Sequence, residues 1–190
     1  MNKFAKNLKM SVPNTYIQQI KFDGNTYSKG SVVDIKETFG IFCREFPFMK
    51  NPRSKALPTR DWPDEDGLDV YVPDTLPIKH YDIDVVFLYV GTEDNIGDNI
   101  SNFIDFIYGR KKGNDGDTVQ SALLAVYNEY VGMGRKDIVV SEVENEIFYI
   151  SDNDPDAIAQ FKVKFTVYDP TTIVSPVKDS SGKVTELSFS

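Results

Sequence analysis

The sequence predicts a single-domain α+β protein over residues 1–190 that is mainly β-structure, with one packed helix and a long proline-rich arm. Aromatic residues make up 13% of the chain, including 13 Phe and 10 Tyr, and such residues favour strands. Several segments alternate apolar and polar residues, whereas one segment has helical spacing. Six prolines fall between residues 46 and 77, and this density excludes a helix or a central strand there.

The chain opens with a predicted β-hairpin. Residues 15–22 and 26–35 contain β-branched residues on either side of Asp23-Gly24-Asn25, which favours a tight turn. The proline-rich segment 46–77 follows as an extended arm. A connection of about 30 residues is unusual inside a compact domain and is usually functional. We therefore expect this arm to lie across a neighbouring surface.

The middle of the chain predicts a buried strand and then a helix. Residues 82–90 form an apolar run that suits a central strand. Residues 98–108 are predicted to form an amphipathic helix that Asp98 or Asn99 caps and Gly109 ends. Its apolar residues recur at the spacing of one helix face, at Ile100, Phe103, Ile104 and Ile107.

The second half predicts further strands and one ambiguous segment. Residues 119–131 carry a helical stripe, yet their Val and Tyr content and the glycines that follow also suit a strand. We expect strands at 138–143 and 146–150, around Glu144-Asn145. Residues 159–168 alternate most clearly and must end at Asp169-Pro170. The segment 176–190 is predicted to be a C-terminal tail, in which 184–189 suits a final strand.

Composition excludes several classes of protein. A formal net charge of −8 argues against a nucleic-acid surface, because Lys and Arg drive phosphate binding. No apolar run has the length of a membrane span or a signal peptide. A single cysteine, Cys43, allows no internal disulfide, so a cytosolic origin is the default expectation.

Candidate chemistry is sparse, and we expect no catalytic, cofactor-binding or metal site. The single histidine, His80, has no nucleophile nearby in sequence, and Cys43 lies in an apolar stretch that suits a buried side chain. The acidic stretches 61–69, 93–98 and 152–156 lack calcium-loop spacing and suit turns and caps, although calcium binding stays open.

Several segments carry a resemblance to known proteins. These are DWPDEDGLDVYVP (61–73), YDIDVVFLYVG (81–91), NISNFIDFIYG (99–109), GRKDIVVSEVEN (134–145) and FKVKFTVYDP (161–170). Their order resembles that of the distal tail (Dit-like) and tail-tube-like proteins of tailed bacteriophages, of the type carried by prophages.

The resemblance implies a β-sandwich or split barrel with one packed helix, and a strand rather than a helix within 119–131. It also implies a non-enzymatic virion structural protein, made in the cytoplasm of a bacterial host, that forms a ring of six copies and joins other tail proteins. Whether the place in the tail is distal, tube or terminator stays open.

The arm contains the candidate interface residues Trp62, Phe46, Phe48 and Tyr71, because exposed aromatic residues are common anchors of interfaces. In the alternative interpretation Trp62 folds back onto its own core. Two other functions compete with tail assembly. One is a monomeric carbohydrate- or ligand-binding β-sandwich, and the other is a hydrolase with paired carboxylates, for which no specific signal is present.

Overall fold

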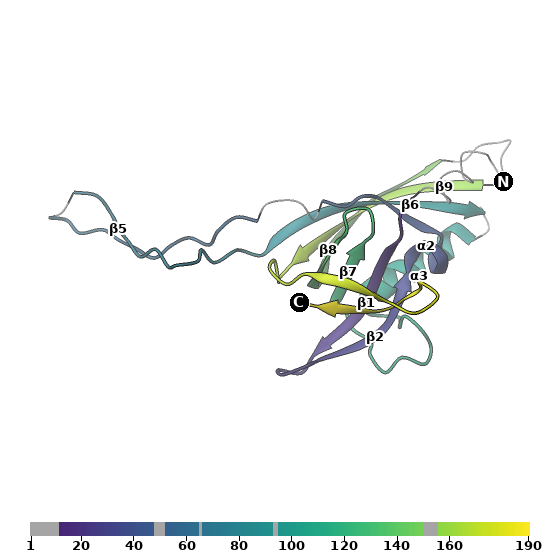
Figure 1. The fold of residues 1–190 in the computed structure, drawn as a ribbon. Coiled ribbons are helices and arrows are strands. Elements are labelled where there is room, and N and C mark those ends of the chain that lie inside the picture. Colours follow the sequence, from purple (N-terminus) through teal and green to yellow (C-terminus); the bar gives the residue numbers. More distant parts are fainter. Residues whose placement is uncertain (1–11, 48–51, 65, 93–94, 150–155) are drawn as a thin grey trace.

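The computed structural model describes residues 12–47, 52–64, 66–92, 95–149 and 156–190. In this part the protein is mainly β, with a large antiparallel sheet packed against helix, which confirms the predicted fold class. A long arm projects from the body (Figure 1). The body elements are β1 (Thr15–Phe22), β2 (Tyr27–Asp34), α2 (Ile35–Phe39), β3 (Ile41–Glu45), β6 (Tyr81–Thr92), α3 (Ile96–Ile107), β7 (Leu124–Asn128), β8 (Met133–Tyr149), β9 (Asp156–Val167), β10 (Val174–Lys178) and β11 (Val184–Phe189).

The main sheet interleaves the two halves of the chain. Its strands follow the order β2-β1-β7-β8-β9-β6-β3, and each is antiparallel to its neighbours. The pairing of β1 with β7 places Ile17 opposite Val126, from distant parts of the sequence. The predicted opening hairpin is confirmed as β1 and β2, and the predicted strands at 82–90 and 159–168 are confirmed as β6 and β9.

Helix α3 fills the inner face of the sheet with aromatic rings. Phe103 lies 5.2 Å from Phe87 of β6 and 5.6 Å from Phe39 of α2, measured between ring centroids. Phe87 also stacks on Phe161 of β9 at 5.6 Å. All of these rings are buried, and they belong to the largest apolar cluster of the protein. Apolar burial of this kind supplies most of the stability of a fold.

The predicted helix is confirmed, but its predicted cap is wrong. The helix starts after Asn95, so Asp98 lies in its first turn. A carboxylate there still stabilises the helix, because it lies near the positive end of the helix dipole. Asn99 instead donates a hydrogen bond to the Tyr89 hydroxyl, at 3.3 Å. Gly109 ends the helix as predicted. It has a φ of 70°, and a Cβ atom there would collide with the backbone of residues 121–122.

The sequence did not predict the short helix α2. Asp34 ends β2 and caps this helix, because its side chain accepts hydrogen bonds from the backbone N–H groups of Lys36 and Glu37. Gly40 closes it in the left-handed conformation, with a φ of 67°. The helix buries Ile35 and Phe39 against the main core.

The ambiguous segment contains a strand, as the resemblance implied and against the helical periodicity. β7 lies between β1 and β8, and Leu124, Ala125 and Val126 are all buried. Consecutive residues of a strand point to opposite faces of the sheet, so a central strand covered on both faces carries an unbroken apolar run. Because apolar residues follow one another in such a run, some of them also fall at helical spacing, which explains the helical periodicity in the sequence.

One further prediction needs correction. The sequence predicted two strands around Glu144-Asn145, but β8 is a single strand that passes through them. The irregularity appears instead as a shift in register with β9 between Glu144 and Ile147. A shift of this kind accommodates an extra residue without ending the strand.

The C-terminal segment forms a hairpin that covers part of the sheet. β10 and β11 pair with each other, and one residue pair, Val174 with Gly134, joins β10 to β8. Val174, Val184 and Leu187 are buried in a second apolar cluster with Tyr16 and residues of β1 and β7. The final strand predicted at 184–189 is confirmed as β11.

Candidate interaction arm

The arm is a narrow ribbon of two antiparallel chain segments, and it connects β3 to β6 (Figure 1). At its root Ser54 bridges Ile78, and the Lys79 N–H donates to the carbonyl of Arg53 at 2.8 Å. Further out, the short strands β4 (Thr59–Arg60) and β5 (Asp69–Val70) pair with each other. The ladder between them is sparse, because prolines have no N–H to donate. The carbonyls of Pro58 and Pro77 still accept backbone hydrogen bonds, from Tyr71 and Lys55.

The described part of the arm buries none of its side chains. In residues 52–64 and 66–80 every side chain is exposed or at most half-buried. Large apolar side chains are among the exposed ones: Trp62, Leu68, Val70, Tyr71, Val72 and Leu76. Tyr71 and Val72 are the most exposed of them, at 69% and 63%. Contiguous exposed apolar surface marks a site of interaction more often than isolated exposed residues do.

Trp62 lies near the outer end of the arm and not on the core of the body. The Arg60 guanidinium lies 3.6 Å from the centre of its ring system, and its Nε1–H donates to the Asp69 carboxylate at 3.2 Å. A cation over an indole ring and a hydrogen bond from its N–H both restrict the side chain. Trp62 is therefore held in place while 39% of it stays exposed.

The four predicted interface residues have different surroundings. Trp62 and Tyr71 are exposed on the arm. Phe46 lies at the start of the arm, where it is half-buried against the main core. Phe48 lies outside the described residues. The arm thus brings two of the four onto one projecting ribbon, and Phe46 anchors its root.

The other end of the arm root is held by aromatic contacts. His80, the single histidine, has its ring 6.0 Å from that of Tyr168, directly after β9. The next residue, Tyr81, packs against the main core. These contacts place His80 at the junction of arm and body.

Cys43 and the acidic stretches can also be placed. Burial raises the pKa of the Cys43 thiol to about 12, so it stays protonated at neutral pH. The described residues of 61–69 lie at the tip of the arm, whereas 93–94 and 152–155 lie outside the described residues. Within the described ranges, no group of three or more His, Cys, Asp or Glu side chains is arranged to hold a metal ion.

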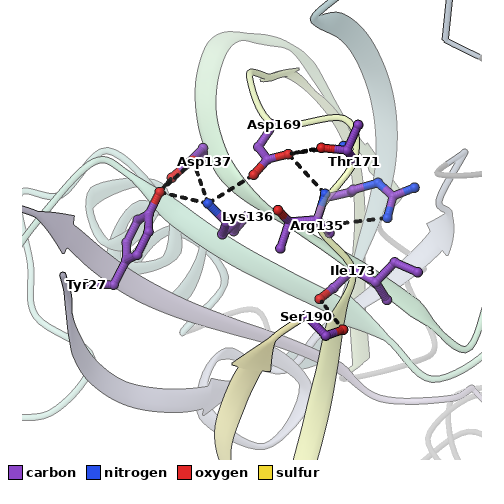
Figure 2. A network of polar contacts seen from close by, with 9 residues as sticks. Tyr27, Arg135, Lys136, Asp137, Asp169, Thr171, Ile173 and Ser190 are labelled. Carbon is purple, nitrogen blue, oxygen red and sulfur yellow. Dashed lines mark hydrogen bonds and ion pairs between the residues drawn. The ribbon is translucent and has the colours of Figure 1, made fainter. Parts of the chain in front are cut away.

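A charge network of the buried Lys136 and its half-buried partners lies on the body, where the C-terminal hairpin leaves β9 (Figure 2). The Lys136 ammonium donates to the Tyr27 hydroxyl at 2.8 Å and contacts the carboxylates of Asp137 and Asp169 at 3.1 and 3.0 Å. Asp169 also accepts hydrogen bonds from Thr171, through its N–H and hydroxyl. The network therefore links β2, the start of β8 and the end of β9.

The electrostatics of this network are those of a satisfied ion cluster. Burial lowers the pKa of Lys136, but its hydrogen bonds to Tyr27 and both carboxylates outweigh burial and hold that pKa above its ordinary value. Burial likewise raises the pKa of Asp169, yet hydrogen bonds from Thr172 and Lys136 outweigh it and keep the pKa below its usual range. All three ammonium protons have acceptors, as a structural role requires.

Sequence reasoning missed the network, because its residues are far apart in the chain. The sequence predicted Asp169 only as the end of a strand. Asp137 also has a positive φ of 53°, which is uncommon in a residue other than glycine and which no pattern in the sequence predicted.

Comparison with known proteins gives no relative: no family model, no curated protein and no solved structure matches the chain. Within the part of the chain that the structure describes, no helix is both long and apolar enough to cross a membrane.

Proposed function

We propose that this protein is a non-enzymatic structural subunit of a phage or prophage tail, and that it assembles through its arm with copies of itself and with other tail proteins. The arm is the observation that carries the assembly role. The tail assignment and the ring of six copies rest on the sequence resemblance.

The arm supports assembly through its energetics. Burying one large apolar side chain stabilises a complex by about 1.5–3 kcal/mol. Six such side chains on the described part of the arm are 39–69% exposed, so burying the remaining exposed area offers on the order of 5–10 kcal/mol before the cost of association is subtracted. In the isolated chain this area stays in contact with water. A neighbouring surface is the place where it can be buried.

The shape of the arm supports the same role. Its prolines restrict the backbone before any partner binds, so less conformational entropy remains to be lost on docking. Trp62 is already fixed by Arg60 and Asp69. Aromatic residues held in this way are typical of interface hot spots.

The test is the solution mass of the full chain, measured by light scattering after size exclusion over a range of concentrations. We expect a species near six times the 21.5 kDa chain mass. Replacing residues 55–77 by a short Gly-Ser linker should yield a monomer. The linker can close the gap, because Ser54 and Ile78 are already bridged.

Point variants separate the arm from the rest of the surface. Trp62→Ala should weaken assembly, whereas Tyr130→Ala, which alters an 82% exposed side chain on the body, should not. A full chain that stays monomeric at every concentration would contradict self-assembly and favour the ligand-binding module.

A further inference from the structure

The charges of the arm are separated along its length. Its root carries the exposed basic side chains Arg53, Lys55 and Lys79 and no acidic residue in 52–55 or 76–80. Its tip carries exposed acidic side chains, with one arginine, Arg60, stacked on Trp62. The acidic residues of the described tip are Asp61, Asp64, Asp66 and Asp69, and one further exposed carboxylate, Asp74, lies between the tip and the root.

The two ends cannot neutralise each other within one chain. Even the nearest residues of the two ends along the chain, Lys55 and Asp61, are six residue steps apart, which corresponds to roughly 20 Å of extended chain. That is about two Debye lengths at physiological salt. None of Arg53, Lys55, Lys79, Asp64 and Asp66 forms an ion pair with another described residue. Both charged ends are therefore available to another molecule.

A second arm is complementary to the first when it runs in the opposite direction. Each acidic tip then lies beside a basic root, whereas a parallel pair would set acid against acid. The antiparallel overlap also brings the middle of each arm, with Tyr71 and Val72, to the other arm. Apolar burial would supply the affinity, and the charges would select direction and register.

We propose that the acidic tip of one copy's arm docks on the basic root of the arm of the next copy. This inference rests on the proposed function, since it names the surface through which copies assemble. Because the two arms run in opposite directions, the tip of each lies on the root of the other, and this two-fold contact joins copies in pairs.

Charge reversal tests this pairing. One variant combines Asp64→Lys with Asp66→Lys at the tip, and a second combines Arg53→Glu with Lys55→Glu at the root. Either alone should weaken self-association by more than about tenfold, because like charges then face each other. Mixing the two variants should restore assembly, with the variants in equal amounts. A chain that carries all four substitutions should assemble by itself.

Folding is controlled by thermal unfolding of each variant, which should match the wild type because these side chains are exposed. Assembly that requires the arm but tolerates both reversals would overturn the pairing and leave the proposed function intact. Loss of assembly in both variants without recovery in the mixture would also overturn it. A wild-type chain that never associates would overturn both proposals.

Discussion

The C-terminal hairpin and the arm are both two-stranded ribbons, but they differ in what their side chains contact. β10 and β11 bury Val174, Val184 and Leu187 against the sheet. The arm exposes Leu68, Val72 and other apolar side chains of similar size. The hairpin thus packs on a surface of its own chain, whereas the described part of the arm leaves these side chains exposed.

Polar contacts show the same difference. Lys29 of β2 reaches the hairpin through an ion pair with Glu186 at 2.6 Å and a hydrogen bond to the Leu187 carbonyl at 2.8 Å. The side chain of Gln18 accepts from the Leu187 N–H. The arm has no comparable contact with the body beyond its root, among the described residues. A two-stranded ribbon with so few contacts to the body is at best marginally stable in water, so binding to another surface would stabilise its conformation.

The largest expected effect is a difference in the free energy of unfolding between a variant of the C-terminal hairpin and a variant of the arm. Leu187→Ala should lower the free energy of unfolding by about 3 kcal/mol, because it leaves a cavity in the second apolar cluster. Leu68→Ala on the arm should change it by less than about 0.5 kcal/mol. Denaturant unfolding of dilute, monomeric protein measures both. Equal losses would mean that the arm packs on the body after all.

The charge network extends the comparison to buried ions. Lys136→Met should destabilise the fold by about 2–3 kcal/mol, because it leaves the carboxylates of Asp137 and Asp169 without their cation. Lys55→Met at the arm root removes the same group from an exposed position and should leave monomer stability unchanged. An unaffected Lys136→Met variant would show that the cluster contributes no net stability.

The pH dependence of stability should come from the body as well. Because the folded pKa of Asp169 is depressed, its contribution is complete above the unfolded pKa of about 3.9 and is lost as the pH falls through the folded pKa. Asp169→Asn should therefore flatten the acid side of the stability curve, measured by unfolding at a series of pH values. Asp64→Asn on the arm is the control, and parallel curves for Asp169→Asn and wild type would contradict this assignment.

The smallest effect concerns the contact that ties the C-terminal hairpin to β2. Lys29→Met should cost about 1 kcal/mol or less, since the Lys29–Glu186 pair is partly exposed and screened by water. The remaining loss would come from the Lys29 ammonium over the Phe189 ring, at 4.2 Å. Unfolding at low and high salt should give a smaller difference at high salt. A salt-independent loss would assign the effect to packing.

Local sequence patterns correctly predicted the elements that have one buried face and one solvent-exposed face. The stripe of α3 and the alternation of β9 both arise because one face meets the core and the other meets water, so the period is visible in the sequence. β7 has no wet face and showed a false helical period. α2 has only five residues, too few for a period, although Asp34 and Gly40 mark its ends.

The candidate site was predicted in outline. Closely spaced prolines predicted an extended arm with Trp62 and Tyr71, because proline acts on its own backbone. The pairing of β4 with β5 and the contact between Trp62 and Asp69 depend on chain reversal, which no single residue encodes. The Lys136 network joins residues more than 100 positions apart, and such contacts leave no local pattern.

The interleaved sheet also has a kinetic consequence. β1 pairs with β7, and β6 pairs with β9, so neither half of the chain can form its strands of the sheet without the other half. Folds dominated by such long-range pairing form slowly, in milliseconds to seconds, because the entropy of loop closure is lost before the stabilising contacts form. During synthesis, β1 can gain its neighbour on the inner edge of the sheet only after β7, more than 100 residues later, has left the ribosome. The order of strands thus delays completion of the sheet well beyond the synthesis of its first strand.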